Sequence, residues 1–213
     1  MMNRFTTSEK EQNRTIDRYY RFQSRIYDST RWSFLFGRKE IIRQLPPLPE
    51  PIVVEIGCGT GYNIKRLVKH YPDGAFYGID LSADMITRAE KNLRHHRNKV
   101  RLLQAPYQEG HSLFPKPVDV ILFSYSLTMI NPQWKMLINQ ALADLKDDGF
   151  LAVVDFHDSR FDWFKSHMGN HHVRMDGHLL SYLEEVSDIK KFNKGRAYGG
   201  IWEYMWCVAQ KCS

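Results

Sequence analysis

Hydrophobic positions along the chain form short apolar runs that alternate with amphipathic segments. The runs predict strands at 53–56, 75–80, 99–104, 117–124 and 150–156, and the segments between them predict helices at 63–70, 84–97 and 132–145. The run at 117–124 is apolar at nearly every position, as expected of a central parallel strand covered on both faces. This alternation predicts an α/β fold with a doubly wound, mostly parallel sheet, which binds ligands at the carboxyl ends of its strands.

Two flanking regions complete the predicted organisation. Residues 19–38 interleave aromatic and basic side chains, and on a helix Tyr19, Phe22 and Ile26 share one face. With a further helix at 39–45, ended by prolines, this predicts an N-terminal helical cap over 1–45, before a Rossmann-like core over 51–213. The end of the chain, from about 193, predicts a C-terminal antiparallel hairpin. We expect a single domain over 1–213. The aromatic helix fits a lid, a surface that enters a lipid interface, or ordinary core packing.

Composition and net charge limit the classes of partner that the protein can bind. A chain of 213 residues with a formal charge of +6 fits one domain that binds something acidic, either anionic lipid or nucleic acid. No apolar run has the length of a membrane span, the start lacks a signal peptide's hydrophobic region, and the three cysteines lack metal-type spacing. We therefore expect a cytoplasmic protein in a reducing compartment.

Three glycines follow the first predicted strand and dominate the chemistry of the sequence. Gly57, Gly59 and Gly61 alternate where the chain must turn sharply and let a ligand approach the backbone. A dinucleotide fingerprint would need its last glycine at position 62, where Tyr62 stands. Asp80 ends the next strand, about twenty residues on, where a carboxylate accepts ribose hydroxyls. The alternative is a glycine-rich turn in a structural domain.

Glu55-x-Gly57-x-Gly59-x-Gly61 resembles motif I of the class I S-adenosylmethionine (SAM) dependent methyltransferases, and the segment 81–86 resembles their adenine-facing segment. The resemblance implies SAM, S-adenosyl-L-methionine, as cofactor. Many relatives have an acid after strand three, whereas this chain has Gln104, a neutral acceptor. The implied cofactor-binding residues are Glu55, Gly57, Cys58, Gly59, Gly61, Asp80, Leu81, Met85, Gln104, Ala105, Ser124 and Tyr125.

Two further stretches, 27–38 and 124–134, resemble the signature segments of the methyltransferases of betaine-lipid synthesis, which trimethylate the amino group of diacylglyceryl-homoserine. The resemblance implies an N-methyltransferase that meets an anionic membrane surface peripherally; related bacterial enzymes methylate phosphatidylethanolamine or ornithine lipids. The alternatives are a methyltransferase for a soluble or nucleic-acid acceptor and a SAM-binding scaffold. We expect no nucleic acid, because 131–134 falls short of the Asn-Pro-Pro-Tyr motif that binds a flipped base.

Methyl transfer to an amine requires that the amine arrive without its extra proton. Tyr125, Asp155 and His157 at predicted strand ends are candidate acceptors, as are Tyr19 and Tyr27 of the cap. Tyr125, Tyr27 and Asp155 are the predicted catalytic residues, although Asp155 also fits a helix-capping role and Tyr125 a packing role. The predicted substrate and membrane contacts are Tyr19, Tyr27, Arg31, Trp32, Arg38 and His157. The proton acceptor itself stays unassigned.

His167, His171 and His172 have helical ligand spacing, but Gly169 and Asn170 interrupt the helix and no other ligand lies near in sequence. We therefore predict no metal. A basic loop beside an anionic lipid surface accounts for these histidines together with Lys165 and Arg174, and the basic run at 188–196 extends that patch. An ordinary solvated face is the alternative.

Overall fold

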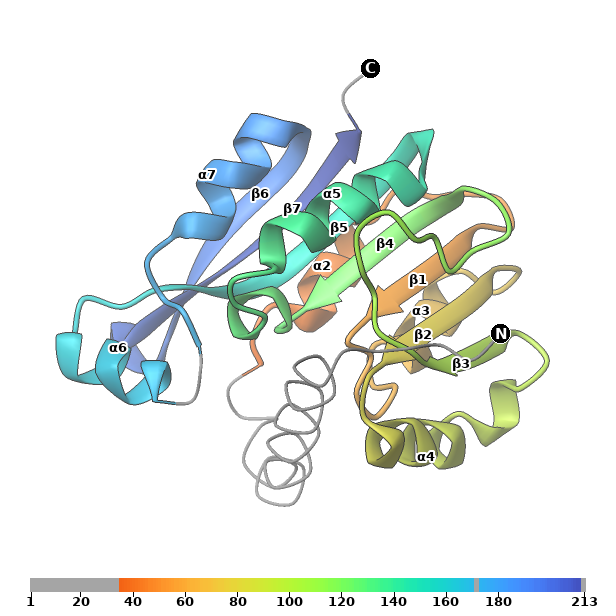
Figure 1. The fold of residues 1–213 in the computed structure, drawn as a ribbon, viewed down its shortest axis with the longest axis horizontal. Coiled ribbons are helices and arrows are strands. Elements are labelled where there is room, and N and C mark those ends of the chain that lie inside the picture. Colours follow the sequence, from red (N-terminus) through yellow and green to blue (C-terminus); the bar gives the residue numbers. More distant parts are fainter. Residues whose placement is uncertain (1–34, 171–172, 212–213) are drawn as a thin grey trace, which may run out of the picture.

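The computed structural model of the protein describes residues 35–170 and 173–211 (Figure 1). Within these residues, seven strands form one sheet in the order β3-β2-β1-β4-β5-β7-β6. The first five strands pair in parallel, and β7 runs antiparallel to both β5 and β6. The strands are β1 Ile52–Ile56, β2 Ala75–Asp80, β3 Val100–Gln104, β4 Val118–Ser124, β5 Leu145–Asp158, β6 Ser187–Ala197 and β7 Trp202–Lys211.

Helices cover both faces of this sheet. In Figure 1, α5 and α7 lie in front of the strands, and α2 and α3 lie behind them. The α-helices are α2 Arg38–Gln44, α3 Ile64–His70, α4 Ala83–Asn92, α5 Trp134–Asp144, α6 Asp162–Gly169 and α7 His178–Val186. Short 3-10 helices are η2 Arg94–His96, η3 Leu127–Met129 and η4 Tyr198–Gly200.

The central strands are apolar because both of their faces are buried. Along β4, Val120 and Leu122 pack into the core beneath α2 and α3, whereas Ile121 and Phe123 pack into the core beneath α5 and α7. Side chains of one strand thus alternate between two hydrophobic cores. The sheet order reverses between β1 and β4, which is the place where doubly wound folds bind ligands.

The predicted fold class is confirmed: the sheet is doubly wound, Rossmann-like and mostly parallel, with antiparallel C-terminal strands. Three boundaries differ clearly from the prediction. Helix α4 ends at Asn92, and the short 3-10 helix η2 replaces the last part of the helix predicted to reach 97. Strand β5 begins at Leu145, which pairs with Val118 ahead of a register shift, so the turn-like residues 147–149 lie inside the strand. The hairpin begins at Ser187, so the basic run at 188–196 is an edge strand. Its side chains are mostly exposed, and the sequence therefore lacks the apolar alternation that identifies a strand.

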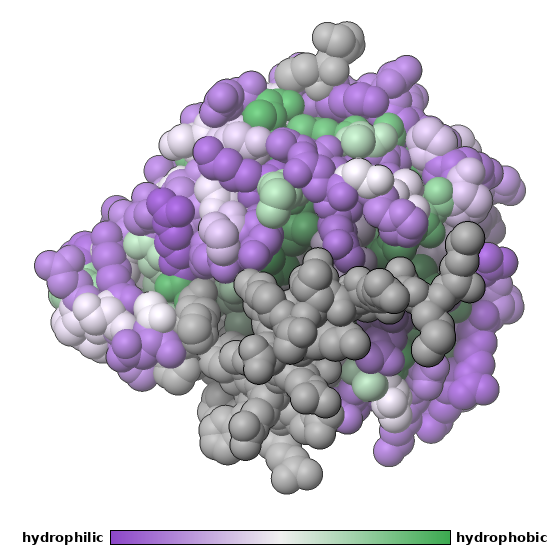
Figure 2. Space-filling view, in the orientation of Figure 1, coloured by the Kyte–Doolittle hydropathy of each residue, from purple (hydrophilic) through white to green (hydrophobic). Residues whose placement is uncertain are grey.

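Most of the predicted cap, including Tyr19, Tyr27, Arg31 and Trp32, lies outside the described residues, as do His171 and His172. None of the helices in the described ranges is long and apolar enough to cross a membrane. The face shown in Figure 2 is largely hydrophilic, with small hydrophobic areas between polar side chains.

Candidate functional site

The glycine loop between β1 and α3 has a backbone that only glycine adopts easily. Gly57, Gly59 and Gly61 have φ values of 73°, 53° and 76°. A Cβ on Gly57 would lie 2.9 Å from the Ser126 Cβ, and one on Gly61 would lie 2.6 Å from the Leu93 Cδ1. Gly59 has no atom of the described residues within 4 Å of such a Cβ. The outer two glycines therefore allow tight packing, and the middle one leaves open space beside the backbone.

Asp80 at the end of β2 holds this loop in place. Its carboxylate accepts hydrogen bonds from the backbone N–H of Gly59 at 2.8 Å and of Ser82 at 2.9 Å. A carboxylate can accept about four hydrogen bonds, so these two contacts alone do not exhaust it. The sequence predicts Asp80 as a ribose acceptor but not its second role, which is to fix the loop that the ligand would approach.

Glu55 lies beneath the loop and is 2% exposed. Its Oε1 accepts from the Asn63 side-chain amide at 2.7 Å, whereas Glu55 Oε2 and Asn63 Oδ1 are buried with no partner among the described residues. Burial raises the pKa of the Glu55 carboxyl to about 8, although the hydrogen bond from Asn63 and the charge of Arg38 oppose the rise. The Glu55–Asn63 pair thus offers unsatisfied polar atoms at the loop. Asn63 was not predicted, since nothing in its spacing marks it as a partner of Glu55.

The pH dependence of the free energy of unfolding should show that the buried Glu55 carboxyl is neutral. Because the native state keeps a proton on Glu55 that the unfolded chain loses above its ordinary pKa of 4.5, Glu55 lowers the free energy of unfolding as pH rises from 4.5 to about 8. Glu55→Gln, which cannot ionise, should lose that dependence of up to about 1.4 kcal/mol per pH unit. Urea unfolding of both proteins at several pH values, with Glu90→Gln on exposed α4 as control, measures the difference. If the free energies of unfolding of wild type and Glu55→Gln differ by the same amount at every pH from 5 to 8, Glu55 is not a buried neutral acid.

Four more of the predicted cofactor residues lie around the ends of β2 and β3: Leu81, Met85, Gln104 and Ala105. The Ala105 N–H donates to the Asp80 carbonyl at 3.3 Å, and the exposed Gln104 amide lies 3.5 Å from the Leu81 carbonyl. Met85 is buried, and its N–H faces the Ser82 hydroxyl that caps α4. This group lies at the same edge of the sheet as the glycine loop.

Tyr125, directly after β4, is buried and has a positive φ of 55°. Its hydroxyl donates to the Phe36 carbonyl at 2.8 Å, and its ring packs on Phe156. Burial raises the pKa of this hydroxyl well above its ordinary value, so the phenolate form is disfavoured. Neighbouring Ser124 is buried with its hydroxyl unpartnered among the described residues. Cys58 in the glycine loop is also buried, and burial raises the pKa of its thiol.

Asp155 on β5 is fully buried and holds the turn after β4. One carboxylate oxygen accepts from the N–H groups of Leu127 and Thr128 at 3.0 and 3.3 Å, and the other accepts from the Thr128 hydroxyl at 2.5 Å and the Phe156 N–H at 2.9 Å. Burial raises the pKa of Asp155 to about 6 despite these donors. The geometry therefore favours capping, here of η3, over proton acceptance, the two roles that the sequence left open.

Arg38 at the start of α2 lies against the glycine loop. Its guanidinium stands 4.0 Å from the centre of the Tyr62 ring, and that of Arg66 stands 3.7 Å from it. Tyr62 and Arg66 were not predicted as site residues. His157, the other described substrate candidate, is half-buried near the end of β5, and its Nδ1 has no partner among the described residues.

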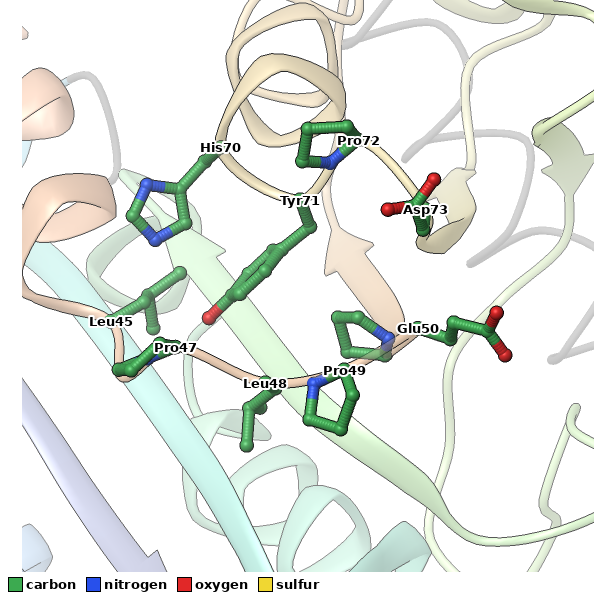
Figure 3. Close-up of a pocket in the computed structure, with 10 residues that line it drawn as sticks. Leu45, Pro47, Leu48, Pro49, Glu50, His70, Tyr71, Pro72 and Asp73 are labelled. Carbon is green, nitrogen blue, oxygen red and sulfur yellow. The ribbon is translucent and has the colours of Figure 1, made fainter.

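A cavity of about 340 Å³ lies at the opposite edge of the sheet, where β1 and β2 begin. Figure 3 shows prolines, Tyr71 and His70 around it, and none of the predicted site residues line it. The Tyr71 hydroxyl donates to the Pro46 carbonyl at 2.7 Å. In the described parts of the chain, no group of three or more acidic, histidine or cysteine side chains could hold a metal ion.

Residues 53–149 match the model of a protein family described as methyltransferase domain. This segment contains the glycine loop, Asp80 and the turn after β4, and the sheet around it has the class I order. Over somewhat less than half of its length, the chain is thus similar to a methyltransferase domain, and this similarity implies SAM as the cofactor. The residues fit this ligand: the open space at Gly59, the Asp80 carboxylate and the unpartnered Glu55 oxygen lie around one loop.

Two curated proteins illustrate the similarity. The chain is 27% identical over 165 residues to the probable S-adenosylmethionine-dependent methyltransferase CRG1 of Saccharomyces cerevisiae, a match to 70% of this chain and 55% of the relative. It is 28% identical over 117 residues to trans-aconitate 2-methyltransferase of Rhodopseudomonas palustris, a match to 54% and 42% respectively. The chain spans about half the length of the curated relatives it matches.

Solved structures share the fold at lower identity. The N-methyltransferase NodS from Bradyrhizobium japonicum, in complex with S-adenosyl-L-homocysteine, superimposes with a TM-score of 0.67 at 17% identity, over 83% of this chain and 86% of that chain. At this level of identity, the similarity shows a shared fold only.

Proposed function

We propose that the protein is a SAM-dependent N-methyltransferase that methylates the amino head group of a membrane lipid, with diacylglyceryl-homoserine as the first candidate. One observation carries the proposal. Two stretches, 27–38 and 124–134, resemble betaine-lipid methyltransferases, and the described end of the first contacts the second, because the Tyr125 hydroxyl donates to the carbonyl of Phe36. Segments 89 residues apart are thereby joined at the carboxyl edge of the sheet.

The reaction requires mainly that the cofactor and the amine be aligned. Methyl transfer to an amine is an in-line displacement at a sulfonium, which a site promotes by positioning the two reactants and excluding water. Asp80 and the glycine loop hold the cofactor, and Asp155 fixes the turn after β4 beside it. Ser126 in that turn donates to the Ile56 carbonyl at 3.3 Å, which ties the turn to the end of β1. These contacts therefore fix the positions of the cofactor and of the acceptor substrate relative to each other.

An aromatic rim, defined as Phe36, Trp163 and Tyr198, supports the lipid assignment. These side chains are 37%, 62% and 49% exposed. The Phe36 and Tyr198 rings are 5.7 Å apart, and the Ser159 hydroxyl before α6 donates to the Ile201 carbonyl beside η4, which brings the elements of the rim together. Exposed Arg160 and Arg196 flank it. Aromatic side chains with nearby cations suit the interface of an anionic membrane.

Vesicle binding tests this rim. Trp163→Ser should lower partitioning onto phosphatidylglycerol vesicles about tenfold, because removing one interfacial tryptophan forfeits on the order of 1–2 kcal/mol of apolar burial. Met136→Ser on α5, which is 41% exposed and away from the rim, serves as the matched control. Co-sedimentation at low and high salt gives the bound fraction. Equal binding by wild type and both variants would show that the aromatic rim does not contact the membrane.

The function itself is tested by methyl transfer from labelled SAM to mixed micelles that contain diacylglyceryl-homoserine, phosphatidylethanolamine or ornithine lipid, with products resolved by mass. Mass increases of one, two or three methyl groups on one lipid identify the head group and the number of transfers. If SAM binds and no lipid is labelled, the lipid assignment fails.

A second candidate is O-methylation of a small carboxylate, which the 28% identity to trans-aconitate 2-methyltransferase favours. Adding trans-aconitate to the same assay separates this candidate from the first. Product esters, which alkali cleaves, would identify O-methylation, whereas N-methyl products survive alkali.

A further inference from the structure

Residues 173–177 cross the carboxyl edge of the sheet and were not predicted as part of the site. The Arg174 N–H donates to the Thr128 carbonyl at 3.0 Å, in the turn after β4. The Gly177 N–H donates to the His157 carbonyl at 2.9 Å, at the end of β5. This segment therefore lies over the ends of β4 and β5. Strand β4 pairs directly with β1, which the glycine loop follows, so the segment lies at the same end of the sheet as that loop.

Asp176 on this segment forms a hydrogen-bonded pair with His178, the first residue of α7. One Asp176 oxygen accepts from the His178 Nδ1, and the other accepts from the Arg174 Nε at 2.7 Å. A hydrogen bond from Nδ1–H to a carboxylate leaves the lone pair of the imidazole on Nε2. The His178 Nε2 is buried with no partner among the described residues, and the side chain is only 8% exposed. An orphaned buried acceptor of this kind calls for a ligand or a functional role.

The surroundings keep His178 neutral and ready to accept a proton. Burial lowers the pKa of its imidazole below 6.5, the nearby charges of Arg174 and His157 act in the same direction, and Asp176 opposes them. The N-terminus of α7, where His178 stands, also disfavours a positive charge. The charge of Lys194 lowers the pKa of the adjacent His157, whereas the charges of Glu203 and Asp158 raise it. Once a proton arrives, the Asp176 carboxylate stabilises the imidazolium, as in other aspartate–histidine pairs.

Two of the candidate acceptors that the structure describes, Asp155 and Tyr125, are already engaged in hydrogen bonds. Asp155 receives four donors, and Tyr125 donates its own proton to Phe36. His157 has an unpartnered Nδ1, and a Cβ on Gly177 would lie 3.3 Å from its ring, so it stands beside the pair without a carboxylate to orient it in the described structure.

We propose that His178, oriented by Asp176, is the proton acceptor of the site, and that the acceptor substrate is therefore an amine rather than a carboxylate. The inference rests on the proposed methyl transfer. The amine lone pair forms the N–C bond as the C–S bond breaks, the bonding electrons go to sulfur, and S-adenosylhomocysteine leaves. The excess proton of the amine passes to the His178 Nε2 and then to water. A carboxylate at neutral pH carries no such proton and needs no acceptor.

The test compares His178→Gln and Asp176→Asn with wild type, using diacylglyceryl-homoserine micelles and labelled SAM. His178→Gln keeps an amide donor for Asp176 but has no basic nitrogen, so kcat should fall about 100-fold or more. The rise of kcat with pH below 6.5 should disappear, and the Kd for SAM by calorimetry should stay within twofold. Asp176→Asn should lower kcat less and shift the acid limb. His111→Gln, in the exposed loop after β3, is the matched control.

A His178→Gln protein with wild-type kcat and an unchanged acid limb would overturn the proposal. If His178→Gln fails to fold, Asp176→Asn decides, and a wild-type pH profile in that variant has the same meaning. If the wild-type protein methylates trans-aconitate and no amine, the acceptor class is wrong. If it methylates nothing in the panel, the proposed function fails separately, and imidazole ¹⁵N spectra then decide: a proton on Nε2 at pH 7.5 overturns the assignment, and a bare Nε2 supports it.

Discussion

Replacing Asp80 by asparagine is expected to weaken SAM binding about 100-fold. The substitution removes the charge that holds the Gly59 N–H at 2.8 Å, and it removes acceptor capacity that the ribose hydroxyls would use. Each hydrogen bond to a charged group contributes about 1.5–3 kcal/mol, so the loss of one or two corresponds to one or more powers of ten in Kd. Calorimetric titration with SAM measures the change.

Asp84→Asn is the matched control, because that carboxylate is exposed on the first turn of α4 only four residues away. It should bind SAM as wild type does, with unfolding changed by less than about 1 kcal/mol through the helix dipole. Equal SAM affinity in Asp80→Asn and Asp84→Asn would show that Asp80 fixes the loop without touching the ligand.

Replacing Asp155 by asparagine is expected to lower the free energy of unfolding by about 2–4 kcal/mol. The amide keeps the shape of the carboxylate, but its NH2 group replaces one of two oxygens that each accept from two of the four donors on Leu127, Thr128 and Phe156. Buried donors left unpaired are among the costliest single changes in a protein core. Urea unfolding at pH 7 measures the effect.

Asp158→Asn, three residues further along β5, is the control. Its carboxylate pairs with Lys165 at 2.6 Å, but both side chains are more than a third exposed, so the loss should stay below about 1 kcal/mol. The pair of variants also separates structure from catalysis. A stable Asp155→Asn protein with a strongly reduced kcat would return Asp155 to the role of proton acceptor.

The fold could be predicted from the sequence because its determinants are local. Runs such as 117–124 are apolar on both faces, and the glycines at 57, 59 and 61 mark the loop after the first strand without help from the rest of the chain. Strand β6 was placed too late because its exposed edge carries lysines, which remove the hydrophobic signal. Local patterns thus identify the buried strands better than the edge strands.

The site was predicted only in part, for a related reason. Gly59 and Asp80 could each be assigned to the ligand site from their positions in the α/β pattern, but the hydrogen bond between them could not be predicted. The contacts of Tyr125 with Phe36 and of Gly177 with His157 depend on how distant segments meet at the sheet edge. The Asp176–His178 pair had a signal, an acid two residues before a histidine, but only the fold shows that these residues lie over β4 and β5.

The lysines of β6 have a consequence for the protein in solution. This strand is the outer edge of the sheet, with one side paired to β7, a register shift after Ile189, and Lys190, Lys191 and Lys194 along its length. An open edge offers unpaired backbone groups to any other extended chain, and charged side chains and irregular pairing discourage that approach. The basic run therefore protects the folded protein from edge-to-edge aggregation, whether or not it ever meets a lipid.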